Sequence, residues 1–297
     1  MKHQIDPKID CVFKALLGAE HNRNLLMHFI NAIIGSDLSA PIDAVEILNP
    51  YNDKEFLEDK MSIVDVKARD AQGALYQIEI QLVSYANLPE RIVYTWADIY
   101  SKQLQSGDDF HLLRPTYAIW LLADNLIRED ADYVHTFKIR DNKGRVLSQH
   151  GGIWLLELKK FNTQQVETEQ QRWLRFFKDG DRLNDEAGLP DWMTTEEMRQ
   201  AMSTLRQFSD KERDYDAYQA RQNFLREQRT IQHELDEEHK ARIEAENREQ
   251  AAVNREQAAL ADKEAALADK EAALADKQAA LAEVERLKAL LAKNNLH

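Results

Sequence analysis

Four polar side chains near the middle of the sequence are spaced so that they could meet at one point. Asp65 and Lys67 lie two residues apart, and so do Glu79 and Gln81. Each pair lies in a run where apolar and polar residues alternate, and successive side chains of a β-strand point to opposite faces. Each pair is therefore expected to share one face of a strand.

The two runs, residues 62–68 and 74–82, are separated by Asp-Ala-Gln-Gly, which is typical of a turn. They are predicted to form a β-hairpin. Counting outward from the turn in equal steps brings Asp65 opposite Glu79, to within one residue. Because cross-strand neighbours have Cβ atoms about 5 Å apart, the two carboxylates are expected to converge.

Two carboxylates at one point favour a divalent cation. Their like charges repel, and one would take up a proton unless a cation lay between them. Mg²⁺ prefers oxygen ligands, and Mn²⁺ suits the same ligands. Such an ion can activate water and neutralise the charge that develops on a phosphodiester. A hairpin whose polar face simply meets solvent would explain the same alternation, so the spacing leaves both interpretations open.

A literal Glu-x-Lys also occurs at Glu157-Leu158-Lys159, after a second predicted hairpin formed by residues 136–139 and 145–147. On spacing alone this segment competes with Glu79-Ile80-Gln81 as the acidic motif.

The elements that must position these residues alternate in type. Continuous apolar runs at residues 117–123 and 152–158 predict strands buried on both faces. Helical spacing is found in residues 10–17, 21–34, from Pro89 to about Ser106, 163–178 and from 195 onward. This order predicts an α/β or α+β sheet flanked by helices.

The sequence also predicts the roles of several individual residues in these helices. Asp10 is expected to cap the first helix. The third helix is expected to turn one apolar face inward, made by Ile92, Val93, Trp96, Ile99 and Tyr100. The one cysteine, Cys11, cannot form an internal disulfide and fits a small filler on a helix.

The composition changes near residue 230 to Ala, Glu, Lys, Arg and Leu without Gly or Pro, which predicts a long helix. A seven-residue repeat places four leucines in one heptad position: Leu260, Leu267, Leu274 and Leu281. A coiled coil needs two apolar positions per heptad, and the partner position holds Gln257, Glu264, Glu271 and Gln278. We expect a solvated helix that pairs weakly, with a single unpaired helix as the equal alternative.

Bulk charge and missing motifs exclude several classes. The formal net charge of −13 argues against indiscriminate coating of nucleic acid. No apolar run approaches the roughly 20 residues of a membrane span, and the N-terminus lacks a signal-peptide pattern. Histidines and the cysteine show no zinc spacing, and no phosphate loop indicates a nucleotide cofactor. These features predict a cytoplasmic protein.

Several segments together resemble the PD-(D/E)xK nuclease family transposases, also called recombination-promoting nucleases. Residues 10–18, DCVFKALLG, resemble the D-x-x-F-K-x-x-F-G opening of that family, and residues 24–34 resemble its next helix. Its D…G…E-x-Q core and the helix after it are similar to Asp65-Val66, Gly73, Glu79-Ile80-Gln81, Arg91, Tyr94, Tyr100 and residues 104–107. Residues 157–161 resemble an E-L-x-K-F segment that lies outside the nuclease motif there. The resemblance covers about residues 6–230.

The resemblance implies a restriction-endonuclease-like αβββαβ core and Mg²⁺- or Mn²⁺-dependent cleavage of double-stranded DNA in recombination or mobile-element processing. Asp65 and Glu79 become metal ligands. Gln81 stands where the wider class has lysine; it can orient water but offers no cation, which leaves Lys67 to supply the charge.

Four further residues are weaker candidates. Glu20, on the first helix, stands where this fold often adds an acidic group, and Asp10 is a second such candidate beside its expected capping role. Lys14 and Arg91 are candidates for contacts to DNA phosphates, with plain surface charge as the equal alternative.

The chain is thus expected to divide into a nuclease-like core (residues 1–130), a family-specific part of the globular region (131–230) and a helical tail (231–297). Cleaving both strands needs two sites, which favours a homodimer held together by the tail. The alternative function is a non-catalytic binding or assembly protein that keeps a relic of the nuclease fold and an oligomerising tail.

Overall fold

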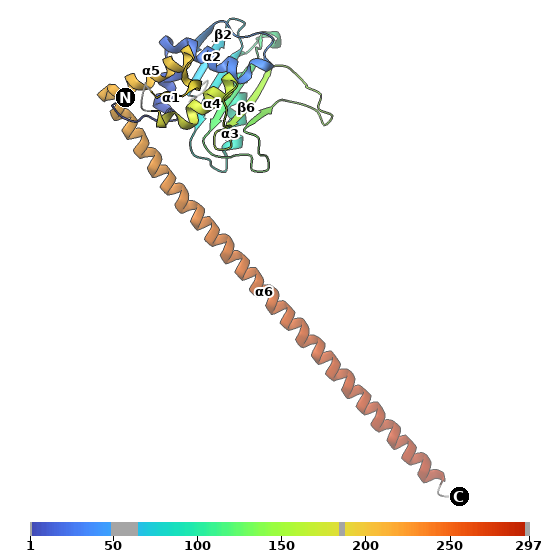
Figure 1. The fold of residues 1–297 in the computed structure, drawn as a ribbon. Helices are drawn as coiled ribbons and strands as arrows, with labels where there is room; N and C mark the ends of the chain where they lie inside the picture. The colour runs from blue at the N-terminus through green and yellow to red at the C-terminus, as the bar shows by residue number, and fades with distance from the viewer. Residues whose placement is uncertain (1, 49–64, 184–187, 295–297) are drawn as a thin grey trace. The chain divides into compact units, whose positions relative to one another are not determined.

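The computed structural model describes residues 2–48, 65–183 and 188–294. The chain divides into two compact units, Met1–Glu227 and Gln228–His297. The first holds the sheet and the helices packed against it, and the second is helical (Figure 1).

The first unit contains one six-stranded mixed sheet in the order β1-β2-β3-β4-β6-β5. Its strands are β1 (Val45–Leu48), β2 (Val66–Asp70), β3 (Leu75–Gln81), β4 (Thr116–Leu122), β5 (Val134–Phe137) and β6 (Gly151–Glu157). The helices are α1 (Asp10–Leu17), α2 (Arg23–Ile34), α3 (Leu88–Ser101), α4 (Glu169–Asp179), α5 (Glu196–Asp210) and α6 (Glu212–Asn294). The order from α1 through β1, β2, β3 and α3 to β4 confirms the predicted αβββαβ core, with added strands and helices and a long C-terminal helix.

The central strands β3, β4 and β6 run parallel, whereas β1, β2 and β5 pair antiparallel with their neighbours. Alternate side chains of these strands enter two separate cores. The larger core lies between one sheet face and α1, α2, α4 and α5. The smaller core lies on the other face, where α3 packs through Leu88 and Ile92 on Trp120 and its neighbours. Odd-numbered residues of β3 therefore point to the α3 side.

The N-terminus of α1 differs from expectation. The N-cap residue is Ile9, and no side chain caps the helix. Asp10 is the first helical residue, and its Oδ1 instead accepts from Arg221 Nε at 2.9 Å. The prediction of an Asp10 cap is therefore wrong, because a long-range cation holds the carboxylate. Its charge still favours the positive end of the helix dipole.

The helix α3 begins as predicted, with a proline in its first turn, but ends at Ser101, five residues earlier than expected. Its buried positions are Leu88, Ile92, Thr95 and Ile99. Val93, which the sequence placed on this face, is 54% exposed. Successive helix residues lie about 100° apart, so Val93 points well away from the face that Ile92 buries. The prediction that Val93 lies on the buried face is therefore wrong.

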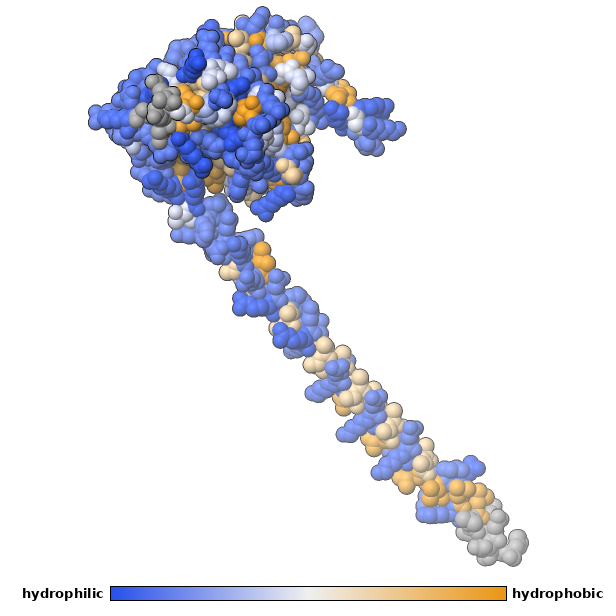
Figure 2. Space-filling model, viewed as in Figure 1, coloured by the Kyte–Doolittle hydropathy of each residue, from blue (hydrophilic) through white to orange (hydrophobic). Residues whose placement is uncertain are grey.

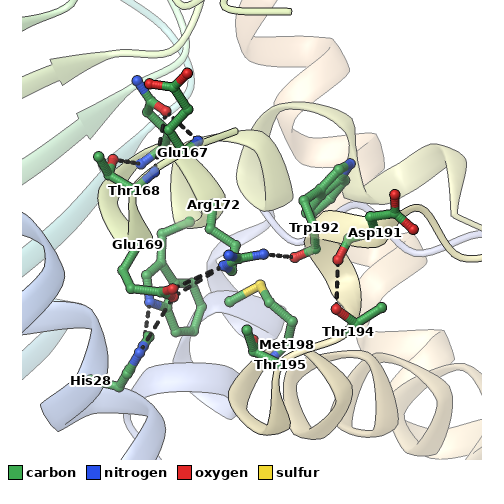
Figure 3. Close-up of polar contacts among 12 residues, drawn as sticks. His28, Glu167, Thr168, Glu169, Arg172, Asp191, Trp192, Thr194, Thr195 and Met198 are labelled. Atoms are coloured by element: carbon green, nitrogen blue, oxygen red, sulfur yellow. Dashed lines mark hydrogen bonds and ion pairs between the residues drawn. The ribbon is translucent and has the colours of Figure 1, made fainter. Parts of the chain in front are cut away.

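The start of α4 is set by a capping box (Figure 3). Thr168 Oγ1 accepts the Gln171 amide, and the Gln171 side chain accepts the Thr168 amide. The helix consequently begins six residues later than predicted. One turn in, Arg172 pairs with Glu169 at 3.1 Å and donates to the Trp192 carbonyl, which ties α4 to the connection before α5.

The predicted hairpin of residues 136–139 and 145–147 is only partly correct. The segment turns at Gly144 and closes with one antiparallel bridge, Arg140 to Val146. The strand β5 pairs instead with β6, because the free edge of β6 supplies a longer ladder.

The helix α6 continues through the leucine repeat, and each of the four repeated leucines is about half exposed. Within the described part of the chain, no helix combines the length and apolarity needed to cross a membrane.

Candidate active site

The hairpin β2–β3 is closed by a turn that Asp70 stabilises. Asp70 Oδ1 accepts the amides of Gln72 at 2.9 Å and Ala74 at 2.8 Å. Gly73 adopts a φ of 88°, in the left-handed region that favours glycine. The predicted turn is confirmed. Of the predicted first strand, residues 62–64 lie outside the described residues.

The register of this hairpin sets the geometry of the site. Val66 pairs with Ile78, so the next pair outward is Asp65 opposite Glu79. The Ile80 amide donates to Asp65 Oδ2 at 3.0 Å, which holds the aspartate against β3. The predicted register is confirmed, and both carboxylates lie on the α3 side of the sheet.

Glu79 is buried and Asp65 is largely buried, so both carboxylates are costly to ionise. Glu79 is 3% exposed. Burial, followed by repulsion from Asp65, raises the pKa of Glu79 to about 8, against the attraction of Arg91. Burial also raises the pKa of Asp65, against the Ile80 amide and Lys14. In the absence of a bound cation, Glu79 therefore favours its protonated form.

Two cations from flanking helices reach the pair. Lys14 Nζ, from α1, lies 3.4 Å from Asp65 Oδ1, and Arg91 Nη2, from α3, lies 3.9 Å from Glu79 Oε2. Both side chains are about 40% exposed. They can therefore face a ligand on one side and the carboxylates on the other. The sequence analysis named Lys14 and Arg91 as candidates for contacts to DNA phosphates. In the structure both lie beside the two acids.

The amide of Gln81 is engaged at both ends. Its Nε2 donates to the Val83 carbonyl at 2.7 Å, and its Oε1 accepts from Arg91 Nη1 at 3.2 Å. The same Arg91 nitrogen donates to Tyr85 Oη at 2.9 Å. Gln81 and Tyr85 together fix the direction of the guanidinium, which also lies over the Trp120 ring at 5.5 Å.

Gln77 extends the polar face of β3. It is fully buried, and its Nε2 donates to Glu79 Oε1 at 3.3 Å and to Thr95 Oγ1 at 3.1 Å. Within the described part of the chain, its Oε1 is buried with no hydrogen-bond partner. This unpaired oxygen belongs to a residue that contacts Glu79, and it is an acceptor that a hydrated cation could use.

The donor set fits Mg²⁺ or Mn²⁺ better than it fits zinc. It consists of two carboxylates and an amide oxygen, and Mg²⁺ commonly binds through one or two carboxylates while it keeps several waters. Residues 2–48, 65–183 and 188–294 contain no group of three or more His, Cys, Asp or Glu side chains placed to hold a metal. Asp65 and Glu79 are the residues that could hold an ion.

The remaining candidates lie in different surroundings. Lys67 lies opposite Gln77 in the register and is half-buried. Glu20 lies beyond the end of α1, in a short 3-10 turn with Asn22, and pairs with Arg23. Its placement on the first helix was wrong, because α1 ends at Leu17.

The competing Glu-x-Lys segment has a structural role. Glu157 is fully buried, and its Oε1 accepts the amides of Leu126 and Ile127. Lys160, which is also buried, forms the ion pair with Glu157. Lys159 is exposed and pairs with Asp124 at 3.1 Å. The Glu and Lys of this motif therefore do not share a site.

The sequence did not single out Gln77, Thr95 or Tyr85. Gln77 lies two residues before Glu79, so the strand alternation could have identified it. Nothing in the local sequence distinguishes Tyr85 or Thr95, whose roles depend on how α3 lies across the sheet.

An αβββαβ core with paired acids on its hairpin and cations on its flanking helices defines a restriction-endonuclease-like protein. The sequence model of the PD-(D/E)XK nuclease family transposases matches residues 7–235, and the chain belongs to that family. No curated protein and no solved structure matches the chain. Family membership supports a nuclease-type function.

Proposed function

We propose that this chain is a metal-dependent DNA endonuclease in which Asp65 and Glu79 hold Mg²⁺ or Mn²⁺. The observation that carries the proposal is the pair of buried, facing carboxylates with Lys14 and Arg91 within 4 Å. The substrate is double-stranded DNA, and the biological setting is recombination or the processing of mobile or foreign DNA.

The ion, when bound, would activate a water and neutralise charge that develops on the phosphodiester. Lys14 favours the ionised form of Asp65 and presents a cation to the substrate. Arg91, oriented by Gln81 and Tyr85, binds the phosphate. Lys67, on the same strand face as Asp65, is an additional candidate for phosphate contact. Because the acids are buried, these electrostatic interactions are stronger than they would be in water.

We also propose that residues 1–130 carry this catalytic core and that residues 131–230 complete the globular region. Double-strand cleavage requires two sites, so the working form is a homodimer. The tail, residues 231–297, is one candidate for holding it together through its repeated leucines.

Cleavage of supercoiled plasmid tests the proposal. Wild type, Asp65→Ala and the control Asp124→Ala would be compared with Mg²⁺, with Mn²⁺ and with EDTA. Asp124 is an exposed acid paired with Lys159, so its loss leaves the site intact. We expect metal-dependent nicking or linearisation by wild type and the control, and none by Asp65→Ala.

Retained cleavage by a folded Asp65→Ala protein would refute the site. No cleavage by folded wild type with either metal would instead support the binding or assembly function, in which the neutral Gln81 reflects a lost activity.

A further inference from the structure

A twelve-residue arm, residues 138–149, projects from the sheet between β5 and β6 (Figure 1). Residues 139–149 are all exposed. The arm has a defined turn: Gly144 has a φ of 79°, and Asp141 Oδ1 accepts the amides of Lys143 at 2.9 Å and Arg145 at 2.8 Å. Because residues 139–149 of this ordered hairpin are exposed, the arm is a candidate binding element.

The arm carries apolar side chains at its root. Ile139 and Leu147 lie opposite one another, since the Leu147 amide donates to the Ile139 carbonyl at 3.0 Å. They are 54% and 79% exposed. Figure 2 shows hydrophobic side chains towards the root of the arm and hydrophilic ones at its tip. Exposed apolar side chains that cluster in this way mark contact surfaces.

A groove lies beside the arm on the α3 side of the sheet. It is a cavity of about 270 Å³ between α3 and the root of the arm. Its walls are mainly Val93, Trp96 and Tyr100 from α3, Phe137 from the end of β5 and Ile139 from the arm. Among the described residues, the smaller core takes helical side chains from α3, whereas α1, α2, α4, α5 and α6 all contribute side chains to the core on the opposite face. Sheets with parallel strands are normally covered on both faces, so this side can accept a further layer.

Charge distinguishes the arm from a neighbouring loop. Residues 138–147 contain four Lys or Arg and one Asp, a net charge of +3 on a chain of −13. The exposed loop 105–112 contains Asp108 and Asp109 and no Lys or Arg, and it also presents Phe110, which is 82% exposed. The loop leads into Thr116 of β4, which pairs with Gly151 where the arm returns to β6. The basic arm and the acidic loop therefore belong to the same end of the sheet.

We propose that the arm, the groove and the acidic loop form a two-fold interface with a second copy of this chain. In such a pair each arm lies across the partner's groove, with its basic tip at the partner's acidic loop. A two-fold interface uses the same surface on both subunits. One chain supplies both the protruding and the receiving element, and both the basic and the acidic partner.

The composition of the arm favours a second copy over nucleic acid. Two of its four cations are already paired: Lys138 with Asp37, and Arg145 with Asp141. Of the four cations of the arm, only Arg140 and Lys143 are then left to contact DNA phosphates. The apolar pair Ile139 and Leu147 continues the groove, which is what a protein partner would cover.

Sedimentation equilibrium of the full-length chain tests the apolar contact between the root of the arm and the partner's groove. Wild type is expected to dimerise, and the Ile139→Asp/Leu147→Asp variant to raise the dimer dissociation constant by on the order of 100-fold. The comparison variant is Leu267→Asp/Leu274→Asp on α6, which replaces two exposed leucines of the competing tail contact. Both pairs are exposed, so equal melting temperatures would show that the first unit remains folded.

Charge reversal tests the electrostatic contact between the basic arm and the partner's acidic loop. Arg140→Glu/Lys143→Glu and Asp108→Lys/Asp109→Lys should each weaken the dimer by on the order of tenfold. The chain that carries all four substitutions should regain affinity, because its acidic arm then meets a basic loop. A DNA-binding arm would show no such rescue, and its arm variant alone would lose DNA affinity.

A monomeric wild type, a dimer that is lost in the α6 variant but kept in the arm variant, or a missing rescue would overturn the interface. The inference does not depend on cleavage. The Asp65→Ala protein should dimerise as wild type does, so failure of the nuclease proposal and failure of the interface can be told apart.

Discussion

Lys14 Nζ, from α1, lies 3.4 Å from Oδ1 of Asp65, the residue before β2. This contact places a cation at the site, whereas the motif itself offers the neutral Gln81. The first helix therefore belongs to the site as well as to the core.

Replacing Lys14 with Ala should lower the cleavage rate by about 100-fold, the usual cost of one lost electrostatic group. Lys14→Arg should retain more activity than Lys14→Ala. Single-turnover cleavage with saturating enzyme separates this effect from DNA binding. The control is Lys159→Ala, which removes a lysine paired with an aspartate elsewhere. Equal rates for Lys14→Ala and wild type would remove Lys14 from the mechanism.

The metal-free protein should lose stability as the pH rises through the range set by Glu79. The folded-state pKa of Glu79, about 8, lies above the 4.5 that is ordinary for a glutamate in an unfolded chain. The folded protein therefore holds a proton that the unfolded chain releases, and this contribution is complete below pH 4.5 and lost by about pH 8. Urea unfolding in EDTA should show a fall on the order of a few kcal/mol between pH 5 and 9.

Glu79→Gln should flatten that pH dependence, because the amide does not titrate. The control Glu46→Gln changes an exposed carboxylate and should follow wild type. A wild-type stability that stays constant or rises over this range would contradict a protonated Glu79 in the metal-free protein.

Replacing Glu157 with Gln should destabilise the fold by about 3–5 kcal/mol, since it leaves the buried Lys160 without its counter-ion. Burial opposes ionisation, yet Lys160 and the Ile127 and Leu126 amides hold the pKa of Glu157 below its usual value. Thermal unfolding would measure the loss. Lys159→Ala should change stability and cleavage little. Loss of cleavage in a stable Lys159→Ala protein would instead support Glu157-Leu158-Lys159 as the catalytic motif.

Cys11 should react slowly with thiol reagents in the folded protein. Burial, followed by repulsion from Asp10, raises the pKa of its thiol to about 11. At pH 8 only about one molecule in a thousand then carries the reactive thiolate. Alkylation should be roughly 100-fold slower than in urea-unfolded protein. Equal rates would mean that α1 does not shield the thiol.

The sequence by itself determined the hairpin and its register. Strand side chains have a period of two and the turn residues are diagnostic, so Asp65 could be placed opposite Glu79 without a structure. Helical periodicity likewise located α1 and α2, and the combined motifs identified the family. The leucine repeat and the absence of Gly and Pro gave the long helix.

Only the tertiary structure decided which cations reach the acids and what Glu157 does. Lys14 and Arg91 both reach the acid pair because α1 and α3 pack on opposite faces of the sheet, and no local pattern encodes that meeting. Burial, which raises the pKa of Glu79, depends on the same packing. The pairing of β5 with β6 was likewise decided by competition between distant strands for one free edge. Contacts between residues far apart in the chain depend on how whole elements pack, and local spacing does not specify them.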